Sequence, residues 1–74
     1  MVDIEKIKSV LPKVVMVADY DEDNYIALAD PEKYKIGGGI YLLSKSTGKA
    51  TSHNPASDFK KFDKAMNNPL WVKK

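Results

Sequence analysis

Residues 37–51, GGGIYLLSKSTGKAT, constrain the fold of this chain more than any other segment. Three glycines interrupt the chain, an apolar stretch follows at 40–44, and Thr47-Gly48 separates it from a second extended stretch at 49–53. Glycine readily adopts the positive φ that a tight hairpin turn requires. The segment therefore predicts two antiparallel strands joined near Gly48, preceded by a flexible or bulged glycine stretch.

Apolar periodicity predicts the first helix and the first two strands. Residues 3–11 carry apolar side chains at helical spacing, Asp3 is suited to cap the helix, and Pro12 ends it. Residues 13–20 are rich in β-branched side chains, and residues 25–29 alternate between two faces, so both segments are expected to be strands. A polar turn joins them.

A second helix is expected to follow Asn54-Pro55, because asparagine caps helices and proline suits the first helical turn. Residues 70–72, LWV, are too apolar for a free end and are expected to dock on the sheet. The apolar stripe of this second helix is expected to consist of Phe59, Phe62, Ala65 and Met66.

These elements predict one α+β domain spanning residues 1–74, with the order α-β-β-β-β-α. The four strands are expected to form an antiparallel meander with both helices over a single face. A chain of 74 residues buries only about 60% of its unfolded surface. It also has no cysteine, and hence no disulfide or thiolate metal site. Stability must come from packing, helped by a partner or by self-association, which leaves a homodimer open.

Charge is unevenly distributed along the chain. All twelve basic residues are lysine, so the bidentate arginine fork that reads guanine edges is missing, which disfavours specific DNA recognition. Residues 1–36 hold five lysines and eight acids, whereas residues 37–74 hold seven lysines and two acids. The segregation indicates either two solvated faces or an electrostatically steered interface.

The window 19–30, DYDEDNYIALAD, has the carboxylate spacing of an EF-hand calcium loop. Asn24 replaces the usual glycine, and the preceding segment is predicted as a strand instead of the entering helix. The alternative is an acidic hairpin turn whose charges stay in water. If a cation binds here, the candidate ligands are Asp19, Asp21, Asp23 and Asp30.

No catalytic centre and no cofactor are expected. Ser52 and His53 are adjacent on a predicted strand and point to opposite faces, so they do not form a nucleophile–base pair. His53, the only histidine, is expected to cap a helix or lie on the surface, with Asp58 nearby. The glycines at 37–39 lead into a strand and not into a helix, which argues against a phosphate-binding loop.

The tyrosines suggest a partner surface. If Ile40 and Leu42 face the core, Tyr41 and Leu43 face outward on the same strand. A sheet covered on one side only would then expose a tyrosine-bearing face suited to a protein partner or to stacking of single-stranded nucleic acid. The alternative is that lysine stems and the Trp71 tail cover this face.

Residues 39–50, GIYLLSKSTGKA, resemble a hairpin of small bacterial domains in which an apolar strand ends in a charged turn, D-K-x-T-G-x-V. Certain toxin-immunity families and PepSY-type domains have this hairpin, and residues 54–59 are similar to segments of small phage or mobile-element proteins. The resemblance covers residues 39–66 and departs from the pattern at Ser44, where an acid is usual, and at Ala50. It implies a binding or inhibitory protein of bacterial or phage origin.

We therefore expect a non-enzymatic, cytoplasmic protein-binding module: an inhibitor, immunity factor or accessory subunit. Calcium binding at 19–30 and single-stranded nucleic-acid binding on the aromatic face are the alternatives. The N-terminal residues do not resemble a leader, and the longest uncharged run, 36–44, is too short for a bilayer, so a complete protein without membrane partners is expected. The residues expected to contact the partner are Tyr20, Asp21, Glu22, Asp23, Tyr25, Tyr34 and Tyr41.

Overall fold

An antiparallel sheet of five strands forms the centre of the computed structural model, which describes residues 3–30, 32 and 38–73. The strand order is β4-β3-β2-β1-β5. The elements are α1 (Ile4–Val10), β1 (Met16–Asp19), β2 (Asn24–Leu28), β3 (Ile40–Ser44), β4 (Ala50–Ser52), the 3-10 turn η1 (Pro55–Ser57), α3 (Phe59–Met66) and β5 (Pro69–Val72). The α+β class and the antiparallel sheet are as predicted.

Helix α1 begins and ends where the sequence predicts. The Asp3 carboxylate accepts a hydrogen bond from the Lys6 backbone N–H at 3.1 Å, which satisfies one of the free donors at the helix start. The helix stops before Pro12, and the Leu11 N–H closes it on the Ile7 carbonyl at 2.7 Å. Ile7 is the buried residue of this helix. The capped amphipathic helix is therefore confirmed.

The β3–β4 hairpin is also confirmed. Gly48 has φ +76°, and its N–H donates to the Ser44 carbonyl at 2.9 Å. Thr51 in β4 pairs with Leu42 in β3, as expected for a register set by this turn. The positive φ is the reason that glycine, with no Cβ, occupies the turn.

The predicted four-stranded meander is wrong in strand number, because residues 69–72 form a fifth strand. Trp71 pairs with Val17 of β1, and the Lys73 N–H donates to the Val15 carbonyl at 2.8 Å. After β4, at one edge of the sheet, the chain crosses through η1 and α3 and returns as β5 at the other edge. The apolar tail thus docks through backbone pairing and through the Trp71 side chain, whereas Leu70 and Val72 remain 53% and 48% exposed.

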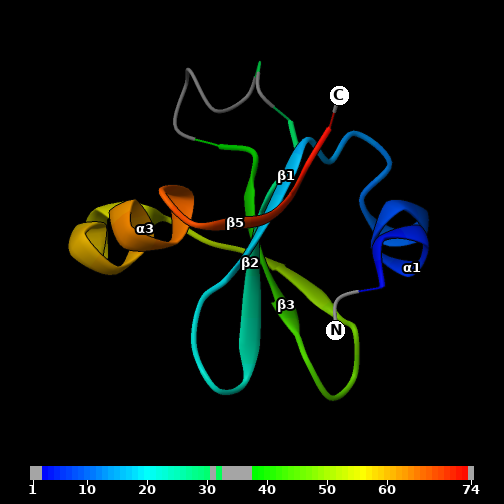
Figure 1. The fold of residues 1–74 in the computed structure, drawn as a ribbon, viewed down its shortest axis with the longest axis horizontal. Coiled ribbons are helices and arrows are strands. Elements are labelled where there is room, and N and C mark those ends of the chain that lie inside the picture. The colour runs from blue at the N-terminus through cyan, green and yellow to red at the C-terminus, as the bar shows by residue number, and fades with distance from the viewer. Residues whose placement is uncertain (1–2, 31, 33–37, 74) are drawn as a thin grey trace.

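Helices α1 and α3 lie on opposite faces of the sheet and not on one face as predicted (Figure 1). Adjacent residues on the central strands point to opposite faces, and Ile26 and Ala27 of β2 are both 0% exposed. Because both faces of β2 are apolar, each needs a cover. On one face Ile7 of α1 joins the buried cluster around Ala27, and on the other Phe62 of α3 joins the cluster around Ile26.

The predicted open tyrosine face is therefore wrong, because α1 covers it. Leu43 is 2% exposed and belongs to the cluster under α1, and Tyr25, Tyr41 and Trp71 are half-buried against the same cluster. The exposed residue of the predicted apolar stripe is Phe59, which is 65% exposed at the start of α3. None of the helices in the described part of the chain has the length and apolar character that a membrane span requires.

Candidate functional site

The β1–β2 hairpin is closed by a turn that Asp21 organises. Its Oδ1 accepts hydrogen bonds from the backbone N–H groups of Asp23 at 2.8 Å and Asn24 at 2.7 Å, and from the Asn24 side-chain amide at 3.2 Å. The backbone adds a bond from the Tyr20 N–H to the Asn24 carbonyl at 3.2 Å. Aspartate commonly stabilises turns in this way, by accepting from the backbone two residues onward. Asp21 is thus a structural residue of the turn.

The pKa of Asp21 lies below its ordinary value. Partial desolvation of the carboxyl group opposes ionisation, but the hydrogen bonds from Asp23 and Asn24 and the nearby Lys61 ammonium together outweigh it. The turn therefore favours the ionised carboxylate.

Two lysines hold the flanks of this hairpin. On one side the Lys45 ammonium bonds the Asp19 carboxylate and lies 5.0 Å from the centroid of the Tyr25 ring. That hydrogen bond raises the pKa of Lys45 despite some desolvation. On the other side the Lys61 ammonium lies 3.5 Å from Asp21 and 4.5 Å from the Tyr20 ring centroid. Each lysine thus ties an acid and a tyrosine of the hairpin to another element.

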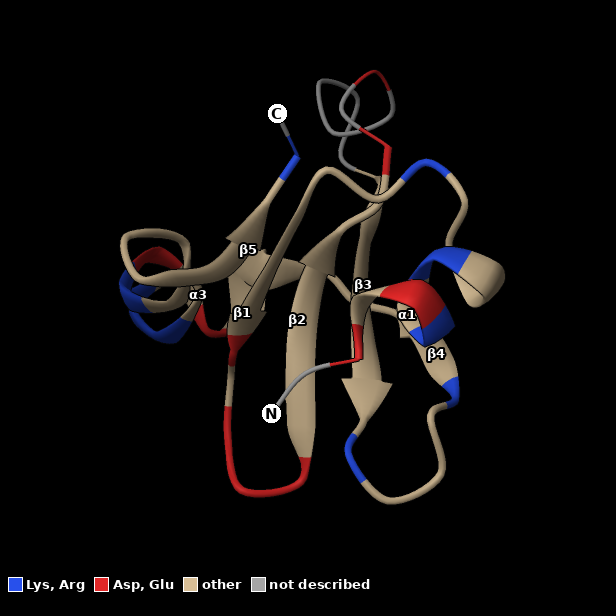
Figure 2. Ribbon diagram, turned by 45° about the vertical axis from the view of Figure 1, so that its right-hand side comes forward, with Lys and Arg blue, Asp and Glu red and all other residues tan. Residues whose placement is uncertain are grey.

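Glu22 and Asp23, at the tip of the hairpin, are both exposed. The acidic loop between β1 and β2 lies at one end of the sheet (Figure 2). Within the described part of the chain, no lysine or histidine lies within ion-pair distance of either carboxylate. Asp19 and Asp21 are therefore paired with lysines of the same chain, whereas Glu22 and Asp23 are two negative charges without a lysine partner among the described residues, held at the tip of an ordered turn.

The four aspartates considered as calcium ligands do not converge. Asp19 and Asp21 face different lysines, and Asp23 belongs to the tip. Asp30 follows the other end of β2, where its carboxylate lies 3.8 Å from the Lys13 ammonium. Among residues 3–30, 32 and 38–73, no three His, Asp or Glu side chains are grouped so as to hold a metal ion. Residues 19–30 contain the end of β1, the turn and β2, so the EF-hand spacing of the carboxylates does not produce EF-hand geometry.

The predicted partner residues fall into separate groups. Tyr20, Asp21, Glu22 and Asp23 are consecutive on the hairpin. Tyr25 and Tyr41 pack against the cluster under α1, each as the second residue of its strand, and Tyr34 is outside the described residues. The structure thus brings together the acidic group with Tyr20 but does not extend it into one continuous tyrosine surface.

His53 occupies a bridging position instead of the expected helix cap or open surface. Its Nε2 lies 3.1 Å from Asp58 Oδ1 and 3.4 Å from the Tyr20 hydroxyl, and its side chain is only 16% exposed. Asp58 precedes α3 yet makes no capping hydrogen bond with its side chain, because its carboxylate faces the imidazole. The contact between Asp58 and His53 links β4 to α3, and Tyr20 extends the link to β1.

Lysines 45 and 61 were missed by the sequence reasoning. Their acidic partners are 26 and 40 positions away, and nothing in the local pattern distinguishes them from other surface lysines. The one available signal was the acidic first half and basic second half of the chain. Part of that segregation is used inside the fold, because both lysines pair with acids of the β1–β2 hairpin.

No protein-family model, curated protein or solved structure matches this chain.

Proposed function

We propose that this chain is a non-enzymatic protein-binding module that docks the tip of its β1–β2 hairpin onto a basic surface of another protein. The observation that carries the proposal is the combination of a hydrogen-bonded turn at Asp21 with two exposed, uncompensated carboxylates at Glu22 and Asp23. An inhibitor, immunity factor or accessory subunit of bacterial or phage origin would act in this way.

Pre-organisation supports binding by this tip. A flexible acidic loop loses conformational entropy when it binds, at about 0.5–1.5 kcal/mol for each immobilised side chain plus the cost of ordering the loop. Here the backbone of the turn is already held through Asp21, and Lys45 and Lys61 fix its two flanks. Less ordering is therefore left for the moment of association.

Electrostatic steering supports a basic partner. Charges at the rim of an interface mainly raise the association rate, and the gain falls as salt rises. The flanking lysines cancel the field of Asp19 and Asp21, so the net negative charge of this end belongs to Glu22 and Asp23. A partner with a lysine- or arginine-rich patch complements it.

The test compares two variants with the same change in net charge. Glu22→Lys/Asp23→Lys reverses the tip, whereas Glu5→Lys/Glu32→Lys reverses two exposed glutamates elsewhere. Asp21 is left unchanged because its substitution would disturb the turn itself. Each protein is immobilised, exposed to a host lysate, and the captured protein is then purified for surface plasmon resonance.

We expect the control variant to bind as the wild type does and the tip variant to associate at least about tenfold more slowly at low salt. The wild-type association rate should also fall as ionic strength rises. If the tip and control variants associate at equal rates with the captured protein, the acidic tip is not the contact surface and the proposal fails.

A further inference from the structure

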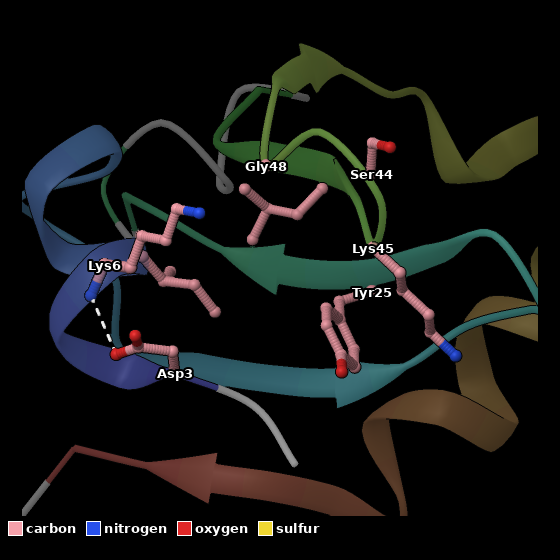
Figure 3. Close-up of a pocket in the computed structure, with 8 residues that line it drawn as sticks. Asp3, Lys6, Tyr25, Ser44, Lys45 and Gly48 are labelled. Carbon is pink, nitrogen blue, oxygen red and sulfur yellow. Dashed lines mark hydrogen bonds between the residues drawn. The ribbon is translucent and has the colours of Figure 1, made fainter.

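A recess of about 210 Å³ lies between α1 and the β3–β4 turn (Figure 3) and adjoins the β1–β2 hairpin, because its lining residue Lys45 donates its backbone N–H to the Asp23 carbonyl at 2.8 Å. Ile7 and Leu43, which are 7% and 2% exposed, provide apolar lining. The Lys6 side chain reaches over the turn from α1, and Tyr25 supplies a phenol from β2. The recess thus combines an apolar lining with a cation.

The Lys6 side chain lies next to Gly48 in the β3–β4 turn. A Cβ at this position would lie 3.5 Å from Lys6 Cε and 3.8 Å from its Nζ, in ordinary van der Waals contact. The Lys6 side chain is exposed, and its ammonium lies beside the turn. A larger side chain at Gly48 would extend into the space beside it.

The Lys6 ammonium is uncompensated. Across the residues that the structure describes, no carboxylate lies within ion-pair distance of it. Asp3 also lines the recess, but one of its oxygens accepts the Lys6 backbone N–H. Lys45 lines the recess with its stem, and its ammonium is bound to Asp19. Lys6 is therefore the cation that remains for a ligand.

The dimensions limit the ligand. A volume of 210 Å³ corresponds to about seven water molecules at roughly 30 Å³ each, which is smaller than most drug-sized sites. We propose that the recess binds a short-chain carboxylate, with its carboxylate group on Lys6 and its alkyl group against Ile7 and Leu43. The source is either a free acid or the C-terminal carboxylate of a peptide that ends in an aliphatic residue.

This site goes beyond the proposed function and uses neither carboxylate of the acidic tip, so each proposal can fail without the other. The probe is isovalerate, which has about seven non-hydrogen atoms and matches the recess in size. It is titrated into the ¹⁵N-labelled full chain, and amide shifts are followed by NMR. Isovaleramide, of the same shape but uncharged, is the matched ligand control.

We expect saturable shifts at Lys6, Ser44 and Gly48 with isovalerate and none with isovaleramide. Lys6→Gln, which keeps the stem and removes the charge, should weaken binding about fivefold, as expected for an exposed charge pair. Lys60→Gln removes an exposed lysine of α3 and should leave binding unchanged. The proposal is overturned if isovalerate and isovaleramide bind equally or if Lys6→Gln and Lys60→Gln have equal effects on binding. It is also overturned if the shifts do not saturate and are spread over many lysines.

Two peptides distinguish the sources of the carboxylate. A tetrapeptide that ends in valine with a free C-terminus is compared with the same peptide amidated. Binding of the free form several-fold tighter than isovalerate, with the amidated form inactive, assigns the site to peptide ends. If isovalerate binds and neither peptide does, the site is one for free acids. If neither isovalerate nor the free peptide binds, the site is refuted.

Discussion

Replacement of Ile7 by alanine tests whether α1 is an essential layer of this fold. Ile7 is the buried residue of the helix, 7% exposed, and it packs in the cluster that contains Val17, Ala27 and Leu43. The substitution removes three carbons from that cluster. At about 0.8 kcal/mol for each buried methylene the transfer term is about 2.4 kcal/mol, within the range of about 2–5 kcal/mol for such substitutions.

That loss is large for a chain of this size. A stability of about 0.05–0.15 kcal/mol per residue gives about 4–11 kcal/mol for 74 residues. Ile7→Ala should therefore lower the melting temperature by roughly 10–20 °C, since each kcal/mol corresponds to about 4–8 °C in a domain of this length. Val10→Ala is the matched control, because Val10 lies on the same helix and is 45% exposed. We expect it to cost less than about 1 kcal/mol.

Urea unfolding followed by Trp71 fluorescence measures the effect. Trp71, the only tryptophan, packs against the same cluster as Ile7 and therefore reports on this layer. Phe62→Ala in the opposite layer should also cost about 3–5 kcal/mol, because α3 covers the other face. If Ile7→Ala shifts the midpoint no more than Val10→Ala at an unchanged slope, α1 does not cover the sheet and the three-layer arrangement is refuted.

Three further predictions concern single interactions. Because folding lowers the pKa of Asp21, the ionised carboxylate stabilises the protein above about pH 4, and this stabilisation is lost as the pH falls further. The urea midpoints of the wild type and of Asp21→Asn should therefore differ at pH 7 and converge as the pH is lowered. Gly48→Ala should cost about 1–2 kcal/mol because φ is +76° while the added Cβ meets no clash, and Gly48→Asn should cost less by the same assay. Asp58→Ala and His53→Ala should each lower the free energy of unfolding by about 1 kcal/mol. A double-mutant cycle should give a coupling energy of at least about 0.5 kcal/mol between the two residues. If the two losses are simply additive, the 3.1 Å contact between them contributes nothing to stability.

Local signals predicted the elements well. Asp3 caps the first helix, Gly48 sets the turn of the second predicted hairpin, and Asn54 caps the turn η1 through a 3.0 Å bond to the Ala56 N–H. Each of these depends on residues within a few positions of one another. The acidic hairpin tip was predicted for the same reason, because four consecutive polar residues between two apolar runs favour a turn.

Long-range features were not predicted. The sequence predicts that residues 25–29 alternate between two faces but not that both faces are covered. Ile26 and Ala27 are both 0% exposed, and alanine gives too weak an apolar signal to indicate a covered second face. The pairing of Lys61 with Asp21 likewise depends on where α3 crosses the sheet. The recess beside Lys6 exists only because α1 packs next to the β3–β4 turn.

Local signals in the sequence are enough to place α1, the acidic β1–β2 turn and the β3–β4 turn, because caps, glycine turns and apolar periodicity act over a few residues. The predicted start of the second helix at Asn54-Pro55 is wrong, since those residues lead into the 3-10 turn η1 and α3 begins at Phe59. The fifth strand at residues 69–72 and the placement of α1 and α3 on opposite faces follow from the tertiary fold alone. The same is true of the packing of Tyr25 and Tyr41 against the cluster under α1. The physical reason is that a strand with two apolar faces must bury both, and which segment covers each face depends on the crossing of the whole chain.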